Sequence, residues 1–178
     1  MADPASPTNA PPSGAPPSGG PPANAGGAPQ DGPSLAVNAQ YIKDFSFENP
    51  RAPQILGMLS QAPQVQVRVN VGARQIGEKF YEVVLDINSE AKIEAEIAFV
   101  VELSYAGLFT VSGLPPEQLR PVLLIEGPRL LFPFAREIIA TATRHGGFPP
   151  LLISPVDFVA LYRQQPAQPE VAAAPPVA

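Results

Sequence analysis

Hydrophobic and polar residues alternate along most of the chain from residue 35 to residue 105. The clearest example, residues 64–71, carries valine at every second position between glutamine, arginine and asparagine. Because a β-strand sends successive side chains to opposite faces, a period of two is typical of strands. The pattern predicts strands over residues 35–48, 64–71, 79–88 and 93–105.

The strand predicted over residues 93–105 has one hydrophobic and one acidic face. At ~3.3 Å per residue it would run for roughly 40 Å, and its hydrophobic face needs a cover. Residues 108–112 either prolong it or form an irregular link. Its hydrophobic face holds Ile93, Ala95, Ile97, Phe99, Val101, Leu103 and Tyr105, and its other face holds Glu94, Glu96, Ala98, Val100, Glu102 and Ser104.

The first predicted strand alternates in the same way. Turns are expected at residues 72–77 and 89–92. Mostly short connections favour an antiparallel meander, although a long connection would let the chain cross over. One face of this strand is predicted to hold Leu35, Val37, Ala39, Tyr41, Lys43, Phe45 and Phe47, and the other Asn38, Gln40, Ile42, Asp44, Ser46 and Glu48.

The second half of the chain has a helical pattern. Gly113 to Glu117 is typical of a helix entry, so a short helix is predicted to about Ile125. Hydrophobic residues at spacings of three and four predict a long helix over residues 129–145, and a last helix ends near Gln164. Strands followed by helices predict an α+β fold, a four-stranded antiparallel sheet with helices packed on one face.

Composition sets the limits of the folded part. Residues 1–33 and 167–178 are rich in proline, alanine and glycine and lack the large apolar side chains that offset the entropy cost of ordering. We therefore expect disordered tails around one domain, residues 34–166. The start of the sequence does not resemble a secretory signal, no apolar run is long enough for a membrane span, and there is no cysteine, so we expect a cytoplasmic protein without membrane insertion.

Charge and the inventory of reactive residues narrow the function. The net charge of −5 argues against a nucleic-acid partner, and acids dominate residues 78–102. That stretch is either a solvated face or a docking face for a basic partner. The single histidine, His145, is explained by the end of the long helix, and no phosphate-binding loop or metal-ligand pattern is present in the sequence. We expect neither enzymatic activity nor a cofactor.

Three segments carry motifs that are specific enough to compare with known families: Tyr41–Pro53 (YIKDFSFENPRAP), Tyr81–Leu85 (YEVVL) and above all Leu130–Pro149 (LLFPFAREIIATATRHGGFP). Together they resemble the SecB protein-export chaperone family. The PVDF-x-AL sequence within residues 153–161 extends the resemblance. It covers essentially the whole predicted domain.

The resemblance implies an ATP-independent chaperone that holds unfolded secretory precursors and passes them to the SecA translocation motor. It also implies a homotetramer built as a dimer of dimers. By position, Asp44, Glu48, Val100 and Glu102 match residues that dock the motor, and Val101, Leu103 and Tyr105 match residues that hold the oligomer together. In the family the C-terminal tail adds motor contacts; here residues 166–178 depart from the family pattern, because Glu170 is their only charged residue.

Client binding is expected on adaptable hydrophobic surface rather than in a specific pocket. The alternative reading is an oligomeric α+β ligand-binding or assembly domain without chaperone activity, whose acidic face only keeps it in solution. The candidate client-binding residues are Ile55, Leu56, Met58, Leu59, Phe148, Leu151, Leu152 and Ile153.

Overall fold

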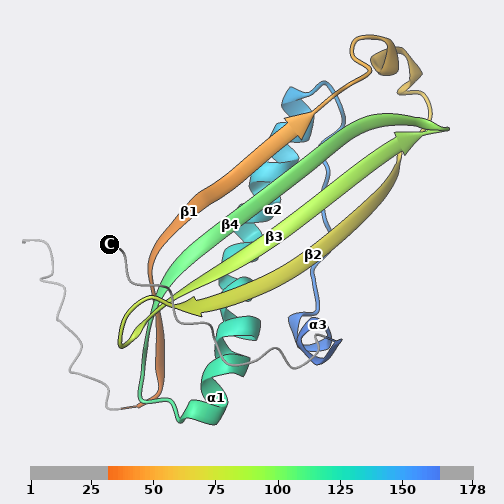
Figure 1. Ribbon diagram of the computed structural model, residues 1–178. Helices are drawn as coiled ribbons and strands as arrows, with labels where there is room; N and C mark the ends of the chain where they lie inside the picture. Colours follow the sequence, from red (N-terminus) through yellow and green to blue (C-terminus); the bar gives the residue numbers. More distant parts are fainter. Residues whose placement is uncertain (1–31, 165–178) are drawn as a thin grey trace, which may run out of the picture. The chain divides into compact units, whose positions relative to one another are not determined.

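The computed structural model describes residues 32–164 (Figure 1). Of the tails expected to be disordered, 1–33 and 167–178, all but residues 32 and 33 lie outside the described residues. Four strands come first and the main helices follow, as the hydrophobic pattern predicted. In chain order the elements are β1 (Ser34–Glu48), the 3₁₀-helix η1 (Gln54–Met58), β2 (Gln64–Gln75), β3 (Phe80–Ile93), β4 (Glu96–Ser112), α1 (Pro116–Pro121), the π-helix η2 (Val122–Glu126), α2 (Gly127–His145) and α3 (Phe158–Gln164).

The strands form one antiparallel sheet in the order β1-β4-β3-β2. The four-stranded antiparallel sheet is confirmed, but the meander favoured for the first two strands is wrong. The link between β1 and β2, which contains η1, carries the chain from one edge of the sheet to the other (Figure 1). The result is a Greek-key order, in which β1 pairs with the last strand.

The hairpin between β3 and β4 turns later than predicted. The turn expected at residues 89–92 is part of β3, because Ser89, Ala91 and Ile93 all pack inward and are almost fully buried. The chain reverses instead at Glu94, which has a φ of 56°. β4 then continues to Ser112, so residues 108–112 prolong the strand.

Two irregularities in β1 change which side chains share a face. The register with β4 shifts between Val37 and Ala39 and again between Ile42 and Asp44. Tyr41 therefore lies opposite Ala106, on the face of the acids, although simple alternation placed it with the hydrophobic residues. An extra residue in one strand of a pair has this effect, and such bulges leave no clear signal in the hydrophobic pattern.

The two helices predicted between residues 117 and 145 form one continuous helical segment. The π-helix η2 joins α1 to α2, and Gly127 and Pro128 begin α2 without a break. A wide π turn makes room for Pro128, which has no N–H and whose ring would clash in a regular turn. A Cβ on Gly127 would lie 3.1 Å from Val83, so glycine lets the helix approach β3 closely.

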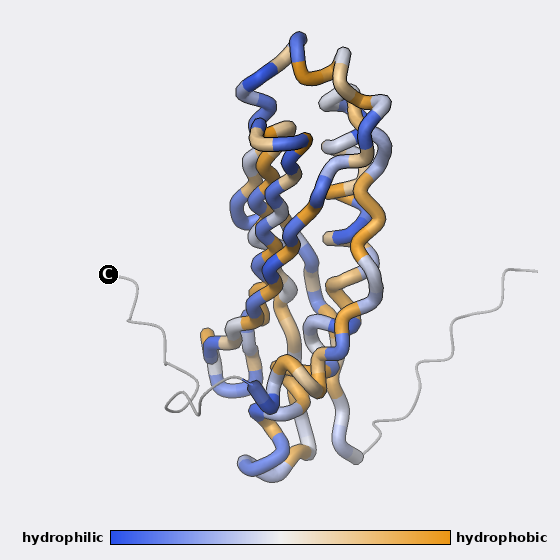
Figure 2. The backbone as a smooth tube through the Cα atoms, turned by 90° about the vertical axis from the view of Figure 1, so that its right-hand side faces the viewer, coloured by the Kyte–Doolittle hydropathy of each residue, from blue (hydrophilic) through white to orange (hydrophobic). Residues whose placement is uncertain are grey.

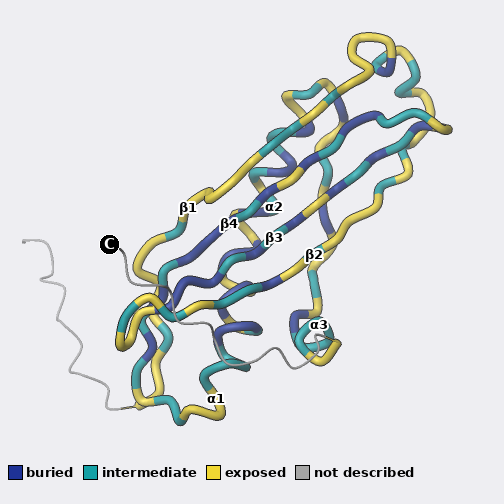
Figure 3. The backbone as a smooth tube through the Cα atoms, viewed as in Figure 1, coloured by how far each residue is buried: buried dark blue, intermediate teal, exposed yellow. Residues whose placement is uncertain are grey.

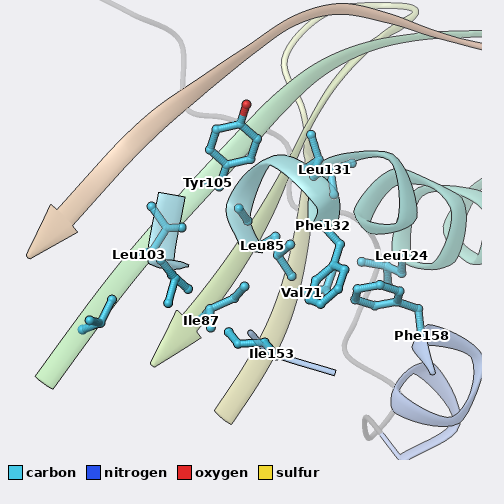
Figure 4. Packing of buried hydrophobic residues seen from close by; sticks show 14 of the residues in the cluster. Val71, Leu85, Ile87, Leu103, Tyr105, Leu124, Leu131, Phe132, Ile153 and Phe158 are labelled. Atoms are coloured by element: carbon cyan, nitrogen blue, oxygen red, sulfur yellow. The ribbon is translucent and has the colours of Figure 1, made fainter. Parts of the chain in front are cut away.

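The core fills the space between α2 and one face of the sheet. Leu85 and Leu103 point from the sheet toward the helix layer that carries Leu131 (Figure 4). Phe158 of α3 packs edge-on against Phe132 of α2, with ring centroids 5.9 Å apart. The central strands β3 and β4 are largely buried, whereas the edge strands β1 and β2 are more exposed (Figure 3). Seen from the side, hydrophobic and hydrophilic residues alternate along the strands (Figure 2).

Candidate docking face on the open side of the sheet

The face of the sheet that points away from α2, here called the open face, carries the four residues predicted to dock a motor. Their positions follow from the pairing of β1 with β4. Glu48 lies directly opposite Val100, and the neighbouring pairs are Ser46 with Glu102 and Asp44 with Ser104. Because paired residues share a face, the structure brings all four side chains together.

Two further acids join them from β3. Asp86 lies opposite Ser104, and Glu90 lies opposite Val100. Asp86 accepts a 2.5 Å hydrogen bond from Ser104, and Glu90 pairs with Lys92 at 2.7 Å. Both acids belong to the acidic stretch of residues 78–102, but the hydrophobic pattern does not show that they lie near β1, because it does not determine the strand order. We name this set the acidic patch: Asp44, Glu48, Asp86, Glu90 and Glu102.

The acidic patch has a shape as well as a charge. A hollow of about 100 Å³ lies between the β4 residues Val100 and Glu102 and the β2 residue Arg68. Carboxylates of one sign concentrated on one face create a local negative potential that attracts cationic groups. Val100 is half-buried and offers an apolar contact among these acidic side chains. The arrangement fits a basic segment that also presents some hydrophobic surface.

A second polar group, the Glu82 cluster, lies farther along the open face. The side chain of Glu82 is only 4% exposed and is held by three donors. Tyr41 Oη donates to Oε1 at 2.5 Å, whereas Lys43 Nζ and Arg74 Nε donate to Oε2 at 2.9 Å and 2.5 Å. The cluster was not predicted, because its members come from β1, β2 and β3, which are brought together only by the strand order.

The cluster keeps Glu82 ionised. Burial alone raises the pKa of this carboxyl, but the hydrogen bonds from Tyr41, Arg74 and Lys43 outweigh burial and lower its pKa from 4.5 to about 2. Burial and the hydrogen bond to Glu82 raise the pKa of Tyr41 to about 12. The phenol therefore stays protonated and acts as a donor throughout the physiological range.

The residues predicted to hold the oligomer together lie on the opposite face of the sheet. Val101, Leu103 and Tyr105 are 0%, 2% and 7% exposed and belong to the core beneath α2. Within one chain they support the position of the helix. The hydroxyl of Tyr105 donates a long hydrogen bond to Oε1 of Gln40, at 3.4 Å.

The candidate client-binding residues fall into two segments that the fold brings together. A Cβ built at Gly147, just before Phe148, would lie 3.2 Å from Leu56 of η1. Ile55, Phe148 and Ile153 are buried and anchor these segments to the core. The others are more accessible: Leu152 is exposed, and Leu56, Met58, Leu59 and Leu151 are half-buried.

Residues 32–164 offer no further candidate site of the kinds considered in the sequence, a metal centre or a membrane span. This part of the chain contains no group of three or more histidine, cysteine, aspartate or glutamate side chains arranged to hold a metal ion. None of its helices combines the length and the hydrophobicity that crossing a membrane requires. His145 is exposed in the last turn of α2, where the sequence placed it.

The fold and the open face define an α+β binding domain with an acidic sheet surface that no helix or strand within residues 32–164 covers. Comparison with known proteins makes this more specific. Residues 28–169 match the family model for the preprotein translocase subunit SecB. The chain is similar to the protein-export protein SecB of Rhodopseudomonas palustris strain TIE-1, with 54% identity over 143 residues, covering 79% of this chain and 91% of the relative.

Two further comparisons agree. The protein-export protein SecB of Granulibacter bethesdensis is 53% identical over 148 residues, covering 79% of this chain and 86% of that protein. A solved SecB-like chaperone from Mycobacterium tuberculosis, in complex with an antitoxin peptide, shares the fold with a TM-score of 0.58 and 16% identity, over 68% of this chain and 90% of that one. The chain belongs to the SecB family of protein-export chaperones, whose members are chaperones rather than enzymes.

Proposed function

We propose that this chain is an ATP-independent cytoplasmic chaperone that holds unfolded secretory precursors and delivers them to the SecA motor through the acidic patch. The observation that carries the motor-docking step is the register that brings Asp44, Glu48, Val100 and Glu102 together on the open face. Membership of the SecB family supports the partner, and the local negative potential supports a basic docking segment.

The proposal includes a homotetramer arranged as a dimer of dimers. The outer side of α2 supports it, since Leu130 is 44% exposed and Phe134 is 52% exposed in the single chain. The edge strand β1 adds exposed hydrophobic surface at Ile42 and Phe45. Contacts between copies would cover these side chains. In this arrangement the contact between copies is formed by α2. Val101, Leu103 and Tyr105 support that contact indirectly, because they pack beneath α2 and hold it in position.

Clients bind, in this proposal, along the half-buried side chains of η1 and of the link after α2. Leu56, Met58, Leu59, Leu151 and Leu152 offer hydrophobic contacts, and the flexible methionine adapts to different partners. Ile55, Phe148 and Ile153 hold that surface in place from the core. The peptide bound to the M. tuberculosis SecB-like chaperone supports peptide binding by this fold. Many weak contacts along an extended client give promiscuity together with slow release.

The deciding experiment follows the aggregation of a reduced, unfolded precursor by light scattering, without nucleotide. Stoichiometric protein is expected to suppress aggregation, and its mass in solution is expected to be that of a tetramer. If aggregation proceeds unchanged at stoichiometric concentration, the holding function is wrong, and a ligand-binding or assembly domain becomes the better description. A globular, folded protein of similar size serves as the control client and should not be bound.

A further inference from the structure

The Glu82 cluster leaves positive charge next to the acidic patch. Lys43 and Arg74 both donate to the single carboxylate of Glu82, so the three charged groups have a formal net charge of +1. The side chains of Lys43 and Arg74 remain 41% and 46% exposed. Each cation donates only part of its N–H groups to Glu82, so donors remain for a further acceptor.

A hollow adjoins these cations. Its volume is about 240 Å³, and it is bounded by Lys43, Arg74, Glu82, Val84 and the β2 residue Gly72. A Cβ built at Gly72 would meet no atom within 4 Å, so the lack of a side chain at this strand position leaves space open. Gly72 pairs with Val84 and lies between Asn70 and Arg74 along β2, on the open face. The site is therefore a space beside two cations that Glu82 holds in place.

We propose that this hollow binds a carboxylate side chain of a partner segment that crosses the open face from the acidic patch. Two residues along a strand correspond to about 7 Å. An extended segment whose basic residues meet Asp44 and Asp86 would therefore bring a residue two to four positions farther along to Gly72. This inference rests on the proposed docking of a basic partner at the acidic patch.

Charge favours a carboxylate that belongs to such a segment over a free anion. The chain has a net charge of −5, and the neighbouring acidic patch repels small anions and anionic surfaces. A carboxylate tied to basic residues is carried into place by their attraction, which raises its effective concentration at the hollow. Lys43 and Arg74 then supply charge-assisted hydrogen bonds.

The proposal predicts that an acidic residue in a basic peptide raises its affinity for this chain, whereas the overall charge of the chain predicts a lower affinity. Without a built site, an acidic residue in a basic peptide weakens binding to a chain of net charge −5. With the site, the acidic residue strengthens binding. Gly72→Val separates the two cases, because valine suits a strand, fills open space and alters no charge.

The experiment uses two synthetic lysine-rich peptides of equal length that differ at one position, glutamate or glutamine, three residues after the last lysine. Binding to the full chain is measured by isothermal titration calorimetry. The wild type is expected to prefer the glutamate peptide by about fivefold, the upper end for an exposed ion pair. Gly72→Val and Arg74→Gln should each abolish the preference. Lys92→Gln, which removes a cation paired with Glu90 away from the hollow, should leave it unchanged.

Equal binding of the two peptides to the wild type, or a preference for glutamine, overturns the proposal. A preference that survives in Gly72→Val also overturns it, as does a failure of both peptides to bind. Arg74→Gln provides a second reading if the valine variant folds poorly. Docking of the SecA motor is judged separately with patch variants, so failure of this carboxylate site is distinguishable from failure of the proposed function.

Discussion

The hydroxyl of Tyr41 donates a 2.5 Å hydrogen bond to Oε1 of Glu82 and so ties the edge strand β1 to β3 across the intervening strand β4. Glu82 is nearly inaccessible to solvent, and its charge depends on such donors. The bond exists because the register shift between Ile42 and Asp44 turns Tyr41 to the open face. A local irregularity in one strand thus decides how three strands are held together.

Replacing Tyr41 with phenylalanine should lower the free energy of unfolding by about 1.5–3 kcal/mol, the range for a hydrogen bond to a charged group. Urea unfolding at a fixed protomer concentration measures the change. The matched control is Tyr105→Phe, since the Tyr105 hydroxyl donates a longer bond, 3.4 Å, to a neutral amide. If both variants lose the same free energy of unfolding, the hydrogen bond from Tyr41 to Glu82 contributes no more to stability than the long bond of Tyr105.

Acid should weaken the fold through Glu82. The pKa of this carboxyl is about 2 in the folded chain, below its ordinary value of 4.5, so its contribution to stability is fully present above pH ~4.5 and is lost as the pH falls toward ~2. Glu82→Gln should therefore be less stable than the wild type at pH 6, and the difference should shrink between pH 4.5 and pH 3. Unfolding by urea across this pH range tests the point. If the difference in the free energy of unfolding between the wild type and Glu82→Gln stays constant with pH, the low pKa of Glu82 does not contribute to stability.

The sequence was sufficient for the element types and for the acidic face. Period-two alternation located all four strands, and it placed Asp44 and Glu48 on one face, where the structure has them. The pairing of β1 with β4 was not predictable, because alternation shows which residues share a face of a strand but not which strands are neighbours. The Glu82 cluster depends on that strand order and on the bulges, so its residues stood out only in the structure.

The helical region shows a second limit. The sequence pattern predicted one helix that ends near Ile125 and another that begins at residue 129. Gly127 and Pro128 lie between them, and such residues commonly flank helices. In the structure the neighbouring π-helix accommodates Pro128, and Gly127 serves close packing against Val83. The same residue types are compatible with a break and with a continuous helix. Tertiary packing decides between them.

Reversing a charge in the acidic patch should weaken motor binding and spare client holding. Asp44→Lys and Glu102→Lys each replace attraction for a basic segment with repulsion, and at least about a tenfold loss in affinity for SecA is expected. Calorimetry with SecA and aggregation assays with an unfolded precursor give the two readouts. Glu94→Lys, in the exposed turn between β3 and β4, is the control of equal charge change. Parallel loss of both activities would point to damaged folding instead.

Truncating Leu103 should destabilise the chain through its core. The side chain is 2% exposed beneath α2, so Leu103→Ala leaves a cavity that costs about 2–5 kcal/mol. Urea unfolding and the solution mass by analytical ultracentrifugation are both measured. If the helix positioned by Leu103 forms the contact between copies, the tetramer should dissociate at higher concentration than the wild type. Ile76→Ala, at a position that is 45% exposed between β2 and β3, should change stability by much less. A cost below about 1 kcal/mol for Leu103→Ala would contradict the packing argument.

Gly146, directly after α2, should tolerate no side chain because of the ring of Phe47. A Cβ there would lie only 2.6 Å from Cε1 of Phe47, whose ring stacks on Phe99 with centroids 6.0 Å apart. The φ of Gly146 is −73°, so alanine meets no backbone strain and the effect is purely steric. Gly146→Ala should cost about 1–3 kcal/mol, as expected for overpacking.

Two comparisons isolate the steric cause. Gly72→Ala makes the same chemical change where a Cβ meets nothing within 4 Å, and it should be neutral or slightly stabilising. The double variant Gly146→Ala with Phe47→Leu should cost less than the sum of the two single changes, because leucine gives up the space that the ring occupied. The free energy of unfolding is measured by heat and by urea for the wild type, the two single variants and the double variant, which completes a double-mutant cycle. Strict additivity at this pair would mean that the ring moves aside without cost, and that the C-terminus of α2 is not fixed by its contact with β1.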